Sequence, residues 1–208
     1  TPIQLSIDSL KEKYSDQLKD KSKNFENYLI TINRQIKDIE KLVNEFSDFA
    51  RMPKPVFREN DLIDLLKENI KLLQELDDSI KITFSNNSEK IILNSDKEQL
   101  NRVFFNLIKN SIESIHQKVE KDRNCNKKIT IELNNYDDHI DLIIVDTGIG
   151  FGNLKSKVKD ILNPYFTTKK NGTGLGLSIV NKIINDHNGK IEFISINEGA
   201  KIEIIFSK

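Results

Sequence analysis

The stretch Asn163–Leu177 reads NPYFTTKKNGTGLGL, and its composition suits neither a core strand nor the middle of a helix. Its glycines, Gly172, Gly174 and Gly176, alternate at the start of an apolar run with helical spacing. Glycines let a backbone approach a ligand closely, and the first turn of a helix presents unpaired N–H groups and the positive end of the helix dipole. The stretch therefore predicts a phosphate-binding site. A glycine-rich turn that only connects two elements is the alternative, and the neighbouring motifs decide between the two.

Composition narrows the class of protein. The chain has 208 residues, with 32 basic and 32 acidic side chains, and this balance argues against a general nucleic-acid binder. Its single cysteine, Cys125, cannot form an internal disulfide, which favours a reducing compartment. No apolar run approaches the length of a membrane span, and the sequence starts TPIQLS without a methionine. We therefore expect a cytoplasmic fragment of a longer protein.

Residues 1–52 carry the pattern of two helices with a polar connector at about Tyr14–Ser22. The second helix has apolar residues at steps of three and four, namely Phe25, Leu29, Ile32, Ile36, Ile39, Val43, Phe46 and Ala50. Two helices alone cannot close a core, so a four-helix bundle built from two chains is expected. The sequence Met52-Pro53-Lys54-Pro55 ends the second helix. A domain boundary at this point gives domains of residues 1–52 and 53–208.

Helices and strands alternate after the boundary. Asp61 is placed to cap a helix that runs to about Leu76, and Ser95 with Glu98 has the spacing of a capping box for a helix through about Ile115. The other expected elements are strands at 80–84, 90–93, 128–133, 139–145, 190–196 and 200–206, and a helix at 175–186. This mixture predicts an α+β sandwich in which helices cover one face of a single sheet.

Two further motifs accompany the glycine-rich stretch. Asn106 and Asn110 are four residues apart and share one face of the expected helix, with Glu113 one turn further on. Their carboxamides can meet a hydrated metal or phosphates, or they can simply face solvent or cap a loop. Asp146 ends an apolar strand and is followed by Thr147-Gly148-Ile149-Gly150. This carboxylate can accept a hydrogen bond from a base with an amine, although a D-x-G turn is also common in loops.

The segments NLIKNSIES, DTGIG, NPYFTTK and GTGLGL, in this order, resemble the N, first glycine, F and second glycine boxes of histidine-kinase catalytic domains. These domains share the GHKL-type ATP-binding fold of gyrase and of the Hsp90-type and mismatch-repair ATPases. The match extends over roughly residues 55–208. The segment LVNEFSDFARMPKP further resembles NtrY-like nitrogen-regulation sensor kinases. The resemblance implies an antiparallel helical hairpin, which forms a dimeric four-helix bundle, followed by an α/β-sandwich ATP-binding domain.

The resemblance also implies roles for individual residues. Asn110 would hold the Mg²⁺ that bridges the phosphates of ATP, with Asn106 beside it, and Asp146 would read the adenine amine. The remaining residues of the implied nucleotide site are Gly148 and Gly150 at the base, Thr168 and Lys169 in the lid, and Gly172, Thr173, Gly174, Leu175 and Gly176 along the triphosphate.

Two departures from the family pattern refine the expectation. The acceptor histidine of the family falls before Thr1, and His116, His139 and His187 do not replace it, so we expect no catalytic residue in this chain and no self-phosphorylation. Related ATPases have a water-activating glutamate at the position of Asn106, whose amide cannot act as a base. The resemblance thus favours a transferase of a two-component signal-transduction system over an ATPase.

In the whole protein, the resemblance implies phosphotransfer from ATP to the upstream histidine and then to an aspartate of a response regulator, whose receiver domain would be a partner beside the homodimer. Nucleic acid is not an expected partner. Membrane contact would come only through upstream segments of an inner-membrane sensor. The alternative is a nucleotide-binding module that dimerises or acts as a scaffold without catalysis.

Overall fold

A computed structural model describes residues 2–14, 22–151, 161–167 and 172–208. The first 52 residues belong to one compact unit, while Pro53–Thr168 and Gly174–Lys208 form the other. Each unit is described by itself. In the described part of the chain, no helix combines the length and apolar character that crossing a membrane requires.

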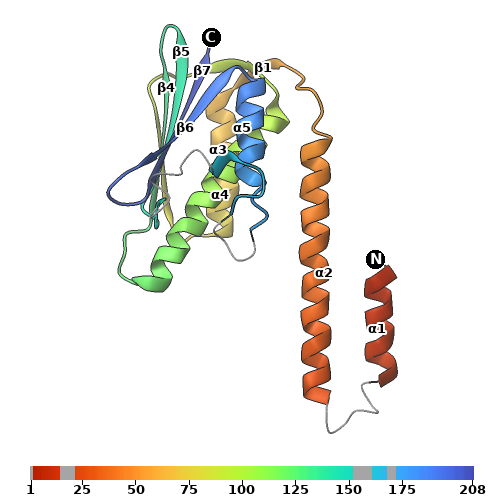
Figure 1. Ribbon diagram of the computed structural model, residues 1–208. Coiled ribbons are helices and arrows are strands. Elements are labelled where there is room, and N and C mark those ends of the chain that lie inside the picture. Colours follow the sequence, from red (N-terminus) through yellow and green to blue (C-terminus); the bar gives the residue numbers. More distant parts are fainter. Residues whose placement is uncertain (1, 15–21, 152–160, 168–171) are drawn as a thin grey trace. The chain divides into compact units, whose positions relative to one another are not determined.

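The N-terminal unit contains two antiparallel helices, α1 (Pro2–Tyr14) and α2 (Ser22–Ala50), which lie side by side in Figure 1. Their packing buries Ile7 and Leu29, each with 5% of its surface exposed. Further along α2, the apolar stripe of Ile32, Ile39, Leu42, Val43 and Phe46 is exposed. The two predicted helices are confirmed, and one hairpin covers only one end of their apolar surface.

The C-terminal unit is built on a mixed five-stranded sheet in the order β2-β4-β5-β7-β6. Its strands are β2 (Lys81–Asn86), β4 (Lys128–Asn135), β5 (His139–Asp146), β6 (Gly189–Ser195) and β7 (Ala200–Ser207). β2 and β4 are parallel, whereas the other neighbours are antiparallel. The predicted hairpin of β4 and β5 is therefore confirmed, and β7 lies in the interior of the sheet between β5 and β6.

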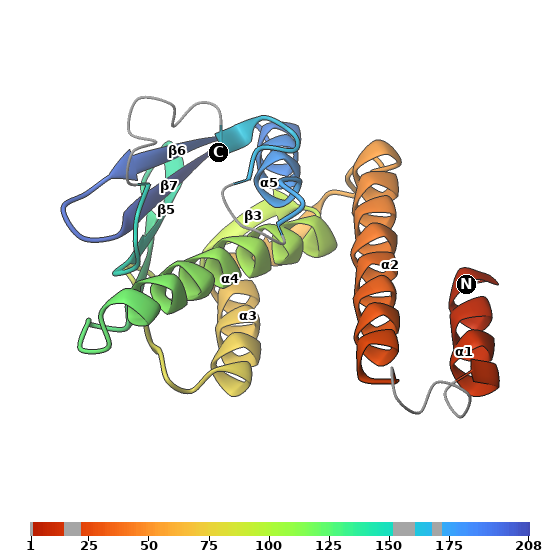
Figure 2. The same ribbon diagram turned by 60° about the horizontal axis from the view of Figure 1, so that its bottom comes forward.

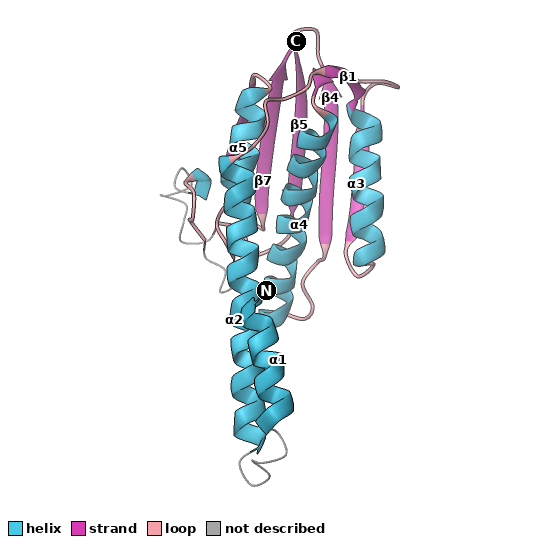
Figure 3. Cartoon of the chain, turned by 90° about the vertical axis from the view of Figure 1, so that its right-hand side faces the viewer, coloured by secondary structure: helices cyan, strands magenta, loops and turns pink. Residues whose placement is uncertain are grey.

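Three helices cover one face of this sheet: α3 (Leu62–Leu76), α4 (Lys97–Lys121) and α5 (Gly176–Asp186), as Figure 3 shows. The central helix is α4, which packs against both α3 and α5 (Figure 2). Buried side chains between the layers include Leu66, Phe104, Leu107, Ile108, Ile131, Leu142, Ile183, Ile204 and Phe206. Burial of these side chains stabilises the unit by roughly 2 kcal/mol each. The α+β sandwich is confirmed.

The start of α4 differs from the prediction. Ser95 was expected to cap this helix, but it is the last residue of β3 (Ile92–Ser95), where its buried hydroxyl donates to the carbonyl oxygen of Leu93. Asp96 is the cap, and its side chain accepts a hydrogen bond from the backbone N–H of Gln99 at 3.0 Å. The helix also continues to Lys121 instead of ending near Ile115. The sequence did not predict these last turns, because their residues are mostly polar and show no apolar spacing.

A short strand, β1 (Arg58–Asp61), was not predicted. It pairs with β3 in a two-stranded antiparallel sheet, which fixes Ser95 in a strand. Asp61 then caps α3 as predicted, with its carboxylate 3.0 Å from the N–H of Ile63. Because the pairing is antiparallel, the start of α3 lies beside the start of β3, and the start of α4 lies beside the residues that precede β1.

Candidate functional site

Asp146 lies at the end of β5 on the face that the helices cover. Along this strand Ile140, Leu142 and Ile144 point to the same side, and Asp146 continues their alternation, so only 3% of it is exposed. Its carboxylate accepts a hydrogen bond from the N–H of Gly148 at 2.8 Å. Burial raises the pKa of Asp146 above the usual value, and the hydrogen bond from Gly148 and the nearby Ser111 hydroxyl offset only part of this rise. The chain itself does not fully compensate this buried charge.

The loop after Asp146 is fixed against α4. The N–H of Ile149 donates to the carbonyl oxygen of Ser114, and the amine of Lys118 donates to that of Thr147, at 3.3 and 3.0 Å. A Cβ added to Gly148 would lie 2.6 Å from the backbone carbon of Ser114. Only glycine allows this contact, so the loop and the helix form one rigid wall beside Asp146.

Gly199 belongs to this site, although the sequence drew no attention to it. It lies in the turn between β6 and β7 with a φ of +82°, and a Cβ there would be 1.8 Å from the carbonyl oxygen of Asp146. Gly150, with a φ of +62°, packs in turn on the carbonyl oxygen of Gly199. The Glu-Gly-Ala sequence predicts a turn, but this packing arises only when distant parts of the chain meet.

Asn106 and Asn110 are half-buried on α4, one turn apart. Asn110 directly precedes Ser111, whose hydroxyl is among the groups of α4 that lower the pKa of Asp146. An amide oxygen is a ligand that suits Mg²⁺. In the described part of the chain, no three His, Cys, Asp or Glu side chains gather as a metal site. The amide oxygen of Asn110 fits a Mg²⁺ ion, which this residue would help to hold.

The glycines before α5 differ in their surroundings. Gly174 has a φ of +71°, and a Cβ there would lie 2.4 Å from the backbone carbon of Tyr165, whose N–H donates to the carbonyl of Gly174. A Cβ on Gly176, the first residue of α5, would meet no atom of the described residues within 4 Å. The buried side chain of Leu175 anchors this end of the helix. The start of α5 is therefore open, as an anion site requires.

Four other residues of this stretch were predicted to belong to the site, namely Thr168, Lys169, Gly172 and Thr173. Gly172 and Thr173 are half-buried. Thr168 and Lys169 lie outside the described residues, and so does most of the expected lid.

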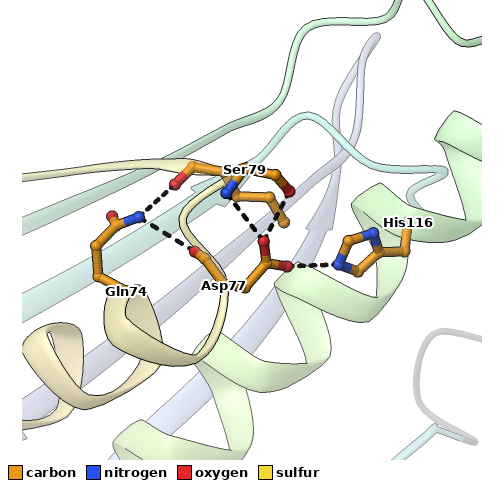
Figure 4. A network of polar contacts seen from close by, with 5 residues as sticks. Gln74, Asp77, Ser79 and His116 are labelled. Atoms are coloured by element: carbon orange, nitrogen blue, oxygen red, sulfur yellow. Dashed lines mark hydrogen bonds and ion pairs between the residues drawn. The ribbon is translucent and has the colours of Figure 1, made fainter.

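The three histidines each have a partner within the chain. His116 lies in α4, and its Nε2 is 2.6 Å from Oδ2 of Asp77 (Figure 4). Asp77 also accepts hydrogen bonds from the N–H and the hydroxyl of Ser79. Partial burial alone would raise the pKa of Asp77, but the hydrogen bonds from Ser79 and His116 outweigh it and lower the pKa. His139 pairs with Asp138 and stacks on Tyr136.

His187 ends α5 and is buried. Its Nδ1 lies 2.8 Å from the carbonyl oxygen of Ile183, and its Nε2 accepts from the N–H of Asp96 at 3.0 Å. A carbonyl oxygen only accepts, so Nδ1 carries the proton and the ring is neutral in this arrangement. His187 thus joins the end of α5 to the start of α4.

The segment that leads into the sheet unit is attached at the same place. The N–H of Val56 donates to Asp96 at 2.7 Å, the side chain of Gln99 donates to the carbonyl of Pro53, and the ring of Phe57 lies edge-on to that of His187. Burial alone would raise the pKa of Asp96, but hydrogen bonds from the backbone N–H groups of Val56 and its own helix outweigh it and lower the pKa.

Comparison with known families agrees with the site. Residues 95–208 match the family described as histidine kinase-, DNA gyrase B-, and HSP90-like ATPase. The chain belongs to this family. An NtrY-like sensor histidine kinase of Rickettsia felis is 36% identical over 207 residues, which are 99% of this chain and 33% of the relative. The nitrogen regulation protein NtrY of Azorhizobium caulinodans is 33% identical over 96% of this chain and 25% of its own length. The chain spans about a third or less of these curated relatives.

Solved structures have the same fold. The nucleotide-free catalytic domain of histidine kinase ThkA is 28% identical, with a TM-score of 0.63 over 74% of this chain and 96% of that one. ThkA in complex with the response regulator protein TrrA gives a TM-score of 0.72 over all of this chain and 58% of that one, at 24% identity, which bears on the fold alone. The predicted ATP-binding sandwich and the resemblance to NtrY-like kinases are confirmed.

Proposed function

We propose that this chain is the ATP-binding core and part of the phosphotransfer hairpin of an NtrY-like sensor histidine kinase. In the whole protein the γ-phosphate of ATP would pass to a histidine that precedes Thr1 and then to an aspartate of a response regulator. The observation that carries the proposal is Asp146. It is a buried carboxylate with an incompletely compensated charge, beside the asparagines of α4, in a chain of this ATPase family.

Asp146 would accept a hydrogen bond from the 6-amino group of adenine. A buried acceptor of this kind discriminates strongly against a base that lacks the matching donor, because the carboxylate would then stay unpaired. Gly148 packs closely on α4 and Gly150 on Gly199, and the bonds from Ile149 and Lys118 hold this loop in place before the nucleotide arrives.

Asn110 would provide the protein oxygen for Mg²⁺, with Asn106 beside it. When bound, the metal supplies positive charge that stabilises the transferring phosphoryl group. The open N-terminus of α5 at Gly176 would direct backbone N–H groups and the helix dipole at the phosphates. Thr168, Lys169, Gly172, Thr173, Gly174 and Leu175 complete the assigned site as its lid and phosphate loop.

The chain places an amide where related ATPases have a general base. Asn106 cannot take a proton from water, so it favours phosphoryl transfer to a protein side chain over hydrolysis. None of the three histidines is available as acceptor, because each already has a structural partner. Without the upstream segment this chain would bind nucleotide and remain unphosphorylated.

The hairpin would serve association. Ile39 and Val43 on α2 are 58% and 55% exposed, and a second hairpin would cover this stripe in a homodimeric four-helix bundle. A receiver domain would dock on that bundle, and ThkA has been crystallised with a response regulator. The whole protein would be an inner-membrane sensor with these residues in the cytoplasm.

Calorimetric titration with ATP, with and without Mg²⁺, tests the site. We expect saturable binding that Mg²⁺ strengthens, and we expect Asn110→Ala to remove the metal dependence. Asn101→Ala is the matched control, because Asn101 lies on the same helix and accepts a hydrogen bond from Asn69 instead. An Asn110→Ala variant with an unchanged metal requirement would place the Mg²⁺ site elsewhere.

A second function, a nucleotide-binding scaffold without catalysis, is favoured by the exposed apolar stripe on α2. Restoring the upstream segment separates the two. A kinase gains acid-labile phosphate on a histidine when ATP is added, whereas a scaffold binds ATP and gains none.

A further inference from the structure

The five residues that lead into the sheet unit, 53–57, form neither helix nor strand, and we call them the strap. Two hydrogen bonds attach the strap to α4. The N–H of Val56 donates to Oδ2 of Asp96 at 2.7 Å, and the side chain of Gln99 donates to the carbonyl oxygen of Pro53 at 3.0 Å. Asp96 is the cap of α4 and Gln99 lies in its first turn, so the strap is fastened to the start of that helix.

The carboxylate of Asp96 is the strongest of these attachments. One of its oxygens accepts from Val56 and the other from the backbone N–H of Gln99. A hydrogen bond to a charged acceptor is stronger than one between neutral groups. The N–H of Asp96 itself donates to the ring of His187, at the end of α5. Because α4 and α5 both hold Asp96, the acceptor stays in place whether or not the strap is bound.

Little apolar burial adds to these two hydrogen bonds. The side chains of Val56 and Phe57 are 62% and 42% exposed. The ring of Phe57 touches that of His187 edge-on, with 5.1 Å between the ring centres. Segments with few buried apolar contacts open locally at a low cost in free energy. The strap can therefore detach while the sheet unit stays folded.

Detachment changes the length of the connection to the hairpin. The helix α2 ends at Ala50, so an attached strap leaves only Arg51 and Met52 between the helix and the first fastened residue. A detached strap leaves residues 51–57 before β1 begins at Arg58. An extended residue spans about 3.3–3.6 Å, so detachment adds roughly 17 Å to the reach of this tether.

We propose that the strap is a releasable clip, which sets the length of the tether between the hairpin and the ATP-binding unit. The attached strap keeps the tether short, and the released strap lets the two units move further apart. The effective concentration of tethered groups depends on tether length, so the clip would regulate phosphoryl transfer from ATP to the histidine that precedes Thr1. This consequence rests on the proposed function, whereas the clip itself does not.

Proline at two strap positions tests the clip. Val56→Pro removes the N–H that binds Asp96 and leaves the cap of α4 intact. Lys54→Pro is the matched control, since it also places a proline after a proline, but the N–H of Lys54 makes no hydrogen bond within the described residues. NMR relaxation of the full chain measures the amides of Met52 and Phe57. We expect order parameters of about 0.85 in the wild type and in Lys54→Pro, and below about 0.6 in Val56→Pro.

Asp96→Asn is a second release variant, which keeps a good helix cap. Its side chain has one oxygen in place of the two that accept from Val56 and Gln99, and its amine only donates. The strap should become as mobile as in Val56→Pro. A rigid strap in both release variants would overturn the clip, and so would a mobile strap in the wild type or in Lys54→Pro.

Calorimetry with ATP separates this inference from the proposed function. The strap contacts none of the residues assigned to the nucleotide, so Val56→Pro should bind ATP as the wild type does. A weaker affinity would show that the strap belongs to the nucleotide site, and it would overturn its role as a tether alone. If the wild-type chain bound no ATP, the proposed function would fall, while the order parameters would still decide whether the strap is a clip.

Discussion

Asp96 and Asp146 are two aspartates that follow or end strands and contact α4, yet their environments act in opposite directions. Asp96 joins the linker to the start of α4 and accepts N–H groups from Val56 and Gln99, so its pKa is lowered despite burial. Asp146 is almost fully buried, and its pKa is raised because burial outweighs the hydrogen bonds that it accepts. A carboxylate whose partners lie within the chain supports the fold. A carboxylate that is buried without enough partners is available to a ligand.

The largest predicted effect is on the loop that follows Asp146, where Gly148 packs on α4. Gly148→Ala should lower the free energy of unfolding by about 2–3 kcal/mol, since its Cβ would overlap the backbone of Ser114 and overpack the contact with α4. Urea denaturation measures the loss. Gly176→Ala is the control, because its Cβ would meet no atom within 4 Å among the residues that the structure describes. Gly176→Ala should leave stability nearly unchanged, and at the proposed phosphate site it should weaken ATP binding. A Gly148→Ala variant as stable as the wild type would contradict the close packing of this loop on α4.

Asp96→Ala should cost about 2 kcal/mol of stability, because it removes the N-cap of α4 and leaves the N–H of Val56 without its acceptor. Its ATP affinity, measured where the chain is fully folded, should not change. Asp61→Ala is the matched control, because it likewise removes a helix cap, that of α3, together with the acceptor of a second N–H, that of Ile91. If folded Asp96→Ala bound ATP more weakly than the wild type, Asp96 would belong to the nucleotide site, and the contrast with Asp146 would be wrong.

Asp146→Asn should lower the affinity for ATP and leave the fold intact, the reverse of Asp96→Ala. ATP affinity should fall about 10-fold, within the range for one buried hydrogen bond to a charged group, while the fold is kept. Because the pKa of Asp146 is raised, its ionised form weakens the fold at neutral pH, and this weakening disappears as the pH falls through the raised pKa. The variant should therefore equal or exceed the wild type in stability at neutral pH and lose that advantage in acid. Unfolding curves at several pH values measure this crossover, and an unchanged ATP affinity would remove Asp146 from the site.

The smallest effect belongs to Asp77, which sits with His116 at the protein surface (Figure 4). The lowered pKa of Asp77 contributes stability that is present above the ordinary carboxyl pKa and is lost as the pH falls through the lowered value. His116→Gln should cost about 0.5 kcal/mol at neutral pH, as is usual for an exposed pair, and nearly nothing once Asp77 is protonated. An undiminished cost in acid would show that His116 acts through packing.

The sequence predicts most elements because their signals are local. Apolar spacing marks the helices and the inward face of β5, and the position of Asp146 follows from that alternation. The cap of α4 could not be chosen locally, because Ser95 and Asp96 are adjacent and both are good caps. The pairing of β1 with β3 decides between them. The packing of Gly199 on Asp146 was not predicted either, since it depends on which distant groups surround this glycine.

The interior position of β7 has a consequence for synthesis on the ribosome. The strands β2, β4 and β5 emerge first, and until β7 follows, β5 presents a row of unpaired N–H and C=O groups along its edge. The helix α5, which packs on α4 and β6, is also synthesised late. The nascent unit therefore cannot complete its sheet one strand after another. It is most exposed to wrong pairing just before its final hairpin arrives, and chaperones would be needed most during that interval.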